Sequence, residues 1–163
     1  RLREDFPHLR VLVLGQGVLE AGLRDLAREL GIEESVCFAG FRDDMPACTQ
    51  AFDIGVLPSI DCDTSSFSLK EEMAAEKPIV ASDYGGLPEI LDDGVEGYIV
   101  PAGTIEPLAD ALAKLIANPE LRRSMGAAGR RRVGRDFTVE VFARRTLDAY
   151  RTTIEIHHER IAY

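Results

Sequence analysis

Two carboxylates and a run of small hydroxyl side chains form the stretch of this sequence best suited to binding a ligand. Asp63 and Glu71 lie eight positions apart, and Thr64, Ser65 and Ser66 directly follow the aspartate. Small polar residues favour the start of a helix, where backbone N–H groups without helical acceptors attract anions, phosphate in particular. Two carboxylates at the rim of one crevice are strong acceptors for sugar hydroxyl groups. The stretch therefore suits a ligand that carries both phosphate and sugar.

The spacing alone leaves a structural interpretation open. Asp63 can simply cap the helix, and Glu71 can be an exposed residue of its second turn. Two glycine motifs are no more specific by themselves. Gly85-Gly86 is typical of a turn, and Gly15-Gln16-Gly17 is only a fragment of a dinucleotide-binding fingerprint.

Short apolar strands alternate with helices along the chain, and these elements must position the candidate residues. The predicted strands are Arg10–Leu14, Ser35–Ala39, Asp53–Leu57, Pro78–Ala81 and Gly97–Val100. The predicted helices are Val18–Leu30, Met45–Ala51, Ser66–Ala75, Glu106–Ala117, Pro119–Arg135 and Val139–His158. Nearly continuous apolar strands between helices indicate a parallel sheet covered on both faces. We therefore predict an α/β fold, a doubly wound Rossmann-like parallel sheet with a helical C-terminal tail, whose ligand lies beyond the carboxyl ends of the strands.

Composition narrows the class of protein. The chain has 163 residues, of which 45% are hydrophobic and 29% charged, and its formal net charge is −9. This length fits one domain with a hydrophobic core, and the negative charge argues against general attraction to nucleic acid or anionic lipid. No apolar run approaches the roughly 18 residues that a membrane-spanning helix needs. The three cysteines are odd in number and lack metal-ligand spacing, which indicates a reducing compartment, and we expect the cytoplasm.

Arginine is concentrated in the last third of the chain. The positions are Arg122, Arg123, Arg130, Arg131, Arg132, Arg135, Arg144, Arg145 and Arg151. Such a concentration is typical of the solvated faces of surface helices. Contact with acidic lipid or with a partner domain is the alternative interpretation.

The stretch from Leu57 to Glu89 resembles the donor-site signature of family 4 of the retaining glycosyltransferases, which have the GT-B fold. That signature is a carboxylate, seven residues and a glutamate, followed by Ala-Met-Ala-x-Gly-x-Pro-Val-Val-Ala and by Gly-Gly-x-x-Glu. The matching positions are Asp63, Glu71, Met73–Ala75, Lys77–Ala81 and Gly85–Glu89. Similarity to the C-terminal, nucleotide-sugar-binding domain of the family extends over nearly the whole chain.

The resemblance implies a role for each matching residue. Two residues are expected in the catalytic site: Glu71 binds the ribose hydroxyl groups of the nucleotide, and Asp63 contacts the transferred sugar. The other donor-binding residues, at the helix start and after the second predicted strand, are Ser65, Ser66, Phe67, Ser68, Gly40, Phe41 and Arg42. The first four of these meet the diphosphate or the sugar, chiefly through backbone amides, and the last three flank the base.

Three departures from the family pattern bear mainly on the sugar pocket. Asp63 stands where the family usually has glutamate and reaches one methylene less far. Thr64–Ser68 replaces a Gly-Phe-Gly sequence, which reduces backbone freedom and adds hydroxyl groups. Glu72 and Glu76 replace alanine and glycine, so Glu76 stands where a glycine usually ends the helix. The resemblance therefore implies the nucleotide role more directly than the identity of the sugar.

The function implied by the resemblance is transfer of a sugar, with retention, from a nucleoside diphosphate sugar to an acceptor that the sequence does not identify. A UDP-sugar is the expected donor, and neither a cofactor nor a metal is expected. Asp61-Cys62-Asp63 leaves open a manganese site, because an Asp-x-Asp triplet binds that metal in a different glycosyltransferase fold. A nucleotide-sugar epimerase or phosphorylase with the GT-B fold is one alternative function, and a non-catalytic nucleotide-sugar-binding module is another.

The resemblance also predicts how the domain is completed. Residues 1–163 are expected to form a C-terminal donor-binding domain that lacks its first strand and most of its first helix, with residues 1–9 as the tail of that helix. The lacking strand is the central one of the family's sheet, between Arg10–Leu14 and Asp53–Leu57 or its neighbour, and the family's catalytic arginine and lysine belong to the same upstream elements. Upstream residues, another segment or a second copy of the chain are the alternatives for filling this gap. The acceptor would bind an N-terminal domain, toward which residues 138–158 are expected to pack. The 163 residues alone are expected to transfer no sugar, and no nucleic-acid partner is expected.

Overall fold

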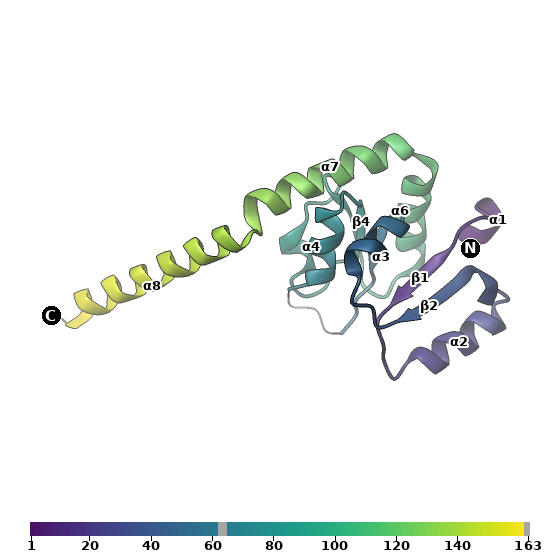
Figure 1. Ribbon diagram of the computed structural model, residues 1–163, viewed down its shortest axis with the longest axis horizontal. Helices are drawn as coiled ribbons and strands as arrows, with labels where there is room; N and C mark the ends of the chain where they lie inside the picture. Colours follow the sequence, from purple (N-terminus) through teal and green to yellow (C-terminus); the bar gives the residue numbers. More distant parts are fainter. Residues whose placement is uncertain (62–64, 162–163) are drawn as a thin grey trace.

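The computed structural model describes residues 1–61 and 65–161, which form two parallel sheets flanked by helices (Figure 1). In one sheet β1 (Val11–Leu14) pairs with β2 (Val36–Gly40). In the other, β4 (Ile79–Ser82) lies between β3 (Gly55–Leu57) and β5 (Gly97–Val100). Every pairing is parallel, so within each sheet the carboxyl ends of the strands share one edge. The predicted parallel α/β architecture is confirmed, with its strands divided between two sheets.

Helices connect the strands and make up the C-terminal third of the chain. They are α1 (Leu2–Asp5), α2 (Glu20–Glu29), α3 (Met45–Ala51), α4 (Phe67–Ala74), α5 (Leu87–Ile90), α6 (Ile105–Ala117), α7 (Pro119–Asp136) and α8 (Val139–Ile161), with a 3₁₀ turn at Glu33–Ser35. The predicted helices agree with these bounds to within a few residues. The single turn of α5 was not predicted, because four residues are too few to show a helical period.

β4 is the most buried strand and divides the core into two layers. Ile79 and Ala81 face α4 and α5, whereas Val80 faces α6, because successive side chains of a strand point to opposite faces. The first layer contains Leu69, Met73, Leu87, Ile90 and Leu91, and the second contains Val100, Ala111, Leu115 and Met125. Helices thus cover both faces of the three-stranded sheet, and the first layer fixes α4 on it.

Two glycines let α7 pack closely across α4. A Cβ atom on Gly126 would overlap the carbonyl oxygen of Glu76, and one on Gly129 would press against Met73. Glu76 itself has a positive φ of 60° at the end of α4, a conformation that glycine adopts more readily. α7 therefore supports the end of α4 that is remote from its serine-rich start.

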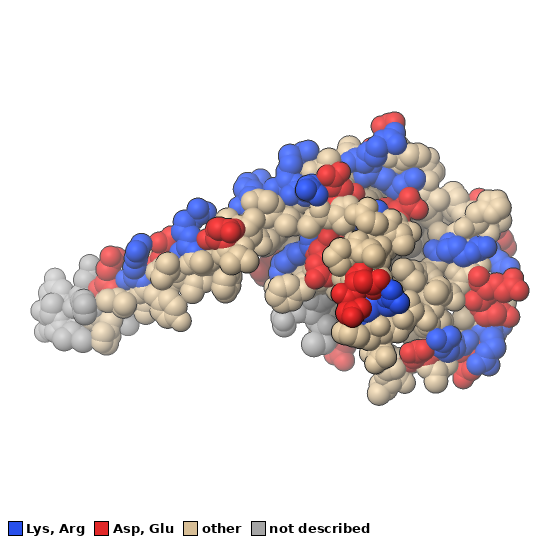
Figure 2. Space-filling model, viewed as in Figure 1, with Lys and Arg blue, Asp and Glu red and all other residues tan. Residues whose placement is uncertain are grey.

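α8 extends away from the rest of the molecule (Figure 1). Its exposed apolar side chains are Val139, Phe142, Leu147, Tyr150, Ile154 and Ile156. Figure 2 shows charged side chains along the upper edge of this helix and uncharged ones along the lower edge. In the part of the chain that the structure describes, no helix is both long and apolar enough to cross a membrane.

Candidate functional site at the start of α4

The loop after β3 lies at the carboxyl edge of the three-stranded sheet and is held by one residue at the end of β4 and one shortly after it. Ser82 Oγ donates a hydrogen bond to the Ser59 carbonyl oxygen at 2.6 Å, and Tyr84 OH donates one to the Asp61 carbonyl oxygen at 2.6 Å. Ser82 is itself buried at the end of β4, which makes it a fixed anchor. The backbone is thereby held at both Ser59 and Asp61.

A serine cap starts α4 at this edge. Ser66 Oγ accepts a hydrogen bond from the Leu69 backbone N–H at 3.2 Å, as expected of an N-cap residue. The first-turn N–H groups of a helix have no acceptor within the helix, and the helix dipole adds positive potential at the same end. The predicted helix start is confirmed, and its amides form a suitable environment for an anion.

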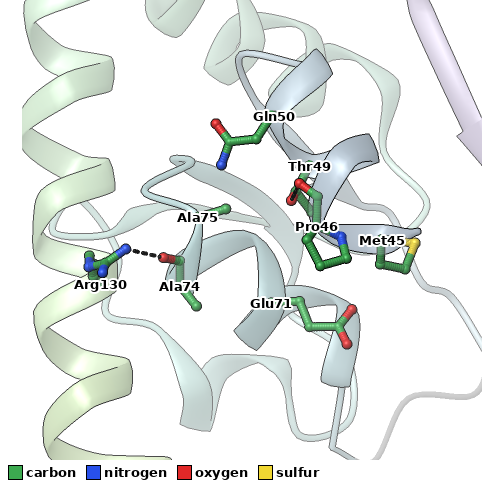
Figure 3. A pocket seen from close by; sticks show the side chains of 8 residues that line it. All are labelled: Met45, Pro46, Thr49, Gln50, Glu71, Ala74, Ala75 and Arg130. Atoms are coloured by element: carbon green, nitrogen blue, oxygen red, sulfur yellow. Dashed lines mark hydrogen bonds between the residues drawn. The ribbon is translucent and has the colours of Figure 1, made fainter. Parts of the chain in front are cut away.

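Glu71 lies on α4 at the rim of a cavity of about 340 Å³ (Figure 3). The other lining residues are Met45, Pro46, Thr49 and Gln50 of α3, Ala74 and Ala75 at the end of α4, and Arg130 of α7. Arg130 Nη1 donates to the Ala74 carbonyl oxygen at 3.0 Å, and its Nε lies 3.6 Å from Glu76 Oε1. Within the described residues nothing donates a hydrogen bond to the side-chain carboxylate of Glu71, which is exposed and can therefore accept hydroxyl groups of a ligand.

The loop after β2 carries the predicted base-flanking residues. Gly40 has a φ of 66°, which suits glycine, and its carbonyl oxygen accepts a hydrogen bond from the Gly15 N–H at 2.8 Å. The Phe41 ring is exposed, and Arg42 pairs with Asp44 through contacts of 2.7 Å (Nε to Oδ1) and 2.6 Å (Nη2 to Oδ2). The hydrogen bond from Arg42 lowers the pKa of Asp44.

That loop leads directly into the cavity of Glu71. α3 begins at Met45, one residue after Asp44, and contributes half of the residues that line the cavity. The structure therefore brings the loop that is predicted to flank the base close to Glu71, the residue that is predicted to bind the ribose.

Glu72, the neighbour of Glu71, is buried instead of exposed. Its Oε2 atom has no hydrogen-bond partner among the described residues, and a Cβ atom on Gly55 of β3 would overlap the carboxyl group. Burial raises the pKa of Glu72 to about 7, and the nearby charge of Glu71 adds to the shift. Adjacent glutamates on one helix thus have opposite environments, one facing the cavity and one facing the strand.

Three further residues shape the site and were not predicted from the sequence. Ser82 and Tyr84 anchor the loop after β3, and Lys70 Nζ donates a hydrogen bond to Ser65 Oγ at 2.7 Å. Ser82 and Tyr84 follow the predicted strand Pro78–Ala81, at the edge where ligands of this fold class bind, and that position was the available signal.

Some predicted residues lie outside the described structure. They are Cys62, Asp63 and Thr64, so the sugar contact of Asp63 and the Asp61-Cys62-Asp63 manganese alternative both stay predictions. Among the residues that are described, no group of three or more His, Cys, Asp or Glu side chains is arranged to hold a metal ion.

The arginines of the last third mostly occupy exposed helix faces, as predicted (Figure 2). Many pair with neighbours on the same helix or next to it, as in Arg123–Glu120, Arg135–Asp136 and Arg151–Asp148. Arg132 differs, because its side chain is only 13% exposed and contacts Asp92 at 2.5 Å and Glu96 at 3.5 Å. This arginine joins α7 to the segment before β5 and is not part of a solvated face.

The fold and site define a class of protein, the C-terminal domain of glycosyltransferases with the GT-B fold. The chain matches Anabaena Alr3699/HepE, solved in complex with UDP-glucose, with a TM-score of 0.83 and 22% identity over 90% of this chain and 42% of that one. It matches the C-terminal domain of a glycosyl transferase group 1 family protein (LpcC) from Francisella tularensis with a TM-score of 0.76 and 24% identity. That match covers 84% of this chain and 74% of the other. At these identities the likenesses establish the fold.

The sequence comparison gives the family. The family model described as "Glycosyl transferases group 1" matches residues 1–132. The phosphatidyl-myo-inositol mannosyltransferase of Mycobacterium leprae is 36% identical over 151 residues, which cover 91% of this chain and 39% of that protein. The chain belongs to the glycosyl transferases group 1 family, and the resemblance predicted from the sequence is confirmed. The chain spans 39% of the length of that mannosyltransferase and 34% of the length of the putative glycosyltransferase EpsD of Bacillus subtilis, to which it is 36% identical over 130 residues.

Proposed function

We propose that this chain is the donor-binding part of a glycosyltransferase that transfers a sugar, with retention, from a nucleoside diphosphate sugar. The observation that carries the proposal is the pairing of two features on α4. Its serine-capped start offers unpaired amides to a diphosphate, and one turn further Glu71 offers a free carboxylate to ribose hydroxyl groups. The two features lie about one helical turn apart, which suits adjacent parts of one nucleotide.

The chemistry that such a site performs is mainly electrostatic. As the bond between the anomeric carbon and the diphosphate oxygen breaks, negative charge builds on the leaving diphosphate. The N-terminus of α4 stabilises this charge through its amides and dipole. Glu71 holds the nucleotide, the loop Gly40–Arg42 flanks the base, and Asp63 contacts the sugar.

A UDP-sugar is the proposed donor. The support is a likeness of fold to Alr3699/HepE, whose structure was solved with UDP-glucose. The relative from Mycobacterium leprae is by name a mannosyltransferase, which supports transfer of a hexose. Neither similarity names the acceptor of this chain.

We also propose how the domain is completed. β1 and β3 each pair on one side only among the described strands, and they belong to separate sheets. An additional strand from upstream, lying between them, would join the two sheets into one. The exposed apolar side chains of α8 would pack against an N-terminal acceptor-binding domain, which would also include or adjoin the remaining catalytic groups.

The test of the donor site is the nucleotide affinity of Glu71→Ala in the full-length protein. Removing a charged hydrogen-bond partner is expected to weaken the bound nucleoside diphosphate by roughly 1.5–3 kcal/mol. Calorimetric titration with UDP, GDP and ADP measures this, and Glu106→Ala, at an exposed position on α6, is the matched control. Unchanged binding of every nucleotide to Glu71→Ala would overturn the assignment.

A further inference from the structure

Lys70 links the start of α4 to the corner between α7 and α8. Its Nζ atom donates a hydrogen bond to Ser65 Oγ at 2.7 Å. The same ammonium group lies 5.3 Å from the centre of the Phe67 ring and 5.4 Å from the centre of the Phe137 ring. Both distances are within the range of a cation–π contact. One cation therefore contacts Ser65, just before the Ser66 cap, Phe67 at the start of α4, and Phe137, just after α7.

The three partners of Lys70 differ in how firmly they are held. Phe137 packs against the buried layer formed by α4, β4 and α5, so its ring is a fixed point. Phe67 is 78% exposed, and Ser65 is also exposed. Lys70 itself is half-buried. The contacts thus run from a fixed ring, through the ammonium group, to two residues that the core does not hold.

Glu71 and Lys70 project from different sides of α4. Glu71 lines the cavity that α4 forms with α3, while Lys70 reaches the end of α7. A change at Lys70 therefore leaves the proposed ribose contact in place and acts on the residues that precede the helix.

We propose that Lys70 is a positioning residue of the donor site, which acts through Ser65 and sets the sugar-binding end of that site. The inference rests on the proposed function and deepens it. Ser65 lies before the cap, on the side of the first-turn amides away from Glu71, so in the proposed arrangement it faces the group beyond the diphosphate. Loss of the ammonium group frees Ser65 Oγ and the Phe67 ring, while the amides and Glu71 stay in place. The consequence is selective: the sugar nucleotide loses affinity and the nucleoside diphosphate does not.

The experiment compares Lys70→Met with Lys70→Arg in the full-length protein. Methionine keeps an apolar stem of similar length, and arginine keeps a cation that can still donate to Ser65 and lie over the rings. Calorimetric titration measures the dissociation constants of UDP-glucose and UDP, or of GDP-mannose and GDP if guanine is the base that binds. Lys70→Met is expected to weaken the sugar nucleotide about three- to tenfold and the diphosphate less than about twofold, since both cation–π contacts and the charged hydrogen bond to Ser65 are lost. Lys70→Arg is expected to restore most of the loss.

Two further variants separate positioning from stability. Phe137→Leu keeps an apolar side chain in the core but removes the ring, and is expected to produce a smaller shift in the same direction. Lys114→Met is the matched control. Lys114 belongs to α6, away from the donor site, and its ammonium group also makes a cation–π contact, 5.4 Å from the centre of the Tyr98 ring on β5. It should leave both dissociation constants unchanged, and melting temperatures of all variants report any general loss of stability.

The outcomes are distinct from those of the Glu71 test. Equal losses for the sugar nucleotide and the diphosphate in Lys70→Met, or no loss for either, would overturn the positioning role while leaving the donor-site assignment in place. Failure of arginine to restore affinity would also count against it. If Glu71→Ala leaves nucleotide binding unchanged, the proposed function itself fails, and the role of Lys70 fails with it.

Discussion

The unit made of β1, α2 and β2 and the unit made of β3, β4 and β5 with their helices differ in how completely they are packed. Leu69, Met73, Ile79, Leu87 and Leu115 of the second unit are fully buried. In the first unit Ala27 is the one buried hydrophobic residue of the described structure, and Val18, Leu19, Leu23, Leu26 and Leu30 are exposed. A helix with such an apolar stripe is normally covered, because burying apolar area is the main favourable term in folding.

The difference in packing bears on the two ends of the proposed donor site. The second unit contains α4, the loop after β3 and Glu71, so most of the proposed donor site is supported by a fully buried core. The first unit includes Gly40–Arg42, which are proposed to flank the base, and among the described strands its β1 pairs with β2 alone. If the additional strand proposed above is present, it would support the base end of the site more than the diphosphate end.

The largest expected effect comes from adding upstream residues that supply a strand between β1 and β3. Each buried backbone group that loses its partner costs about 1–3 kcal/mol, and domains are stable by only about 5–15 kcal/mol. The longer chain is therefore expected to gain several kcal/mol in free energy of unfolding, mostly in the first unit. Hydrogen exchange measures it residue by residue: the β1 and β2 amides should gain protection, while those of β4 change little. Equal protection of both units in the 163-residue chain would contradict the comparison.

Truncating one side chain in each unit sharpens the contrast. Met73→Ala removes a fully buried side chain between α4 and β4 and is expected to cost about 2–5 kcal/mol. Leu23→Ala on α2 starts from a side chain that is 45% exposed and is expected to cost less than about 1 kcal/mol. Urea denaturation of both variants gives the two values. Similar costs would mean that α2 packs as firmly as α4.

Glu72 tests the packed unit through pH. The pKa of its carboxyl group is raised from 4.5 to about 7 in the folded protein, so the folded state binds the proton more tightly than the unfolded state. The stability that this provides is complete below about pH 4.5 and is lost as the pH rises through about 7. Between pH 5 and pH 7.5 the native protein should lose roughly 2.5 kcal/mol relative to Glu72→Gln, which cannot ionise. Urea denaturation at pH 5 and pH 7.5 measures the difference, with Glu106→Gln as the control. If the free energies of unfolding of the native protein and of Glu72→Gln change equally with pH, the raised pKa of Glu72 is contradicted.

The smallest expected effect concerns the sugar end of the donor site. Asp63→Ala in the full-length protein is expected to weaken a sugar nucleotide by about tenfold, as for loss of one charged hydrogen bond, and to leave the free diphosphate almost unchanged. Titration with UDP-glucose and UDP measures both. Equal losses for the two ligands, or a requirement for added manganese, would favour the Asp61-Cys62-Asp63 metal site instead.

Local sequence pattern was sufficient for the elements and for part of the site. The five strands, the helices of more than one turn and the serine cap of α4 follow from apolar periodicity and from the chemistry of helix ends, which involve residues within one or two turns of each other. The carboxylate spacing and the motif after it led to Glu71 and to the family. The same local pattern did not predict that the strands would divide between two sheets, because pairing joins segments that are distant in the sequence.

Tertiary packing decided the remaining contacts. Lys70 meets Phe137 only because α7 crosses α4 at two glycines, and Ser82 reaches the Ser59 carbonyl only because β3 and β4 pair in parallel. Glu71 and Glu72 are neighbours in the chain, yet one faces a cavity and the other a strand. Helix periodicity sets the angle between two such residues, but the direction in which the helix is turned depends on which of its faces the core buries.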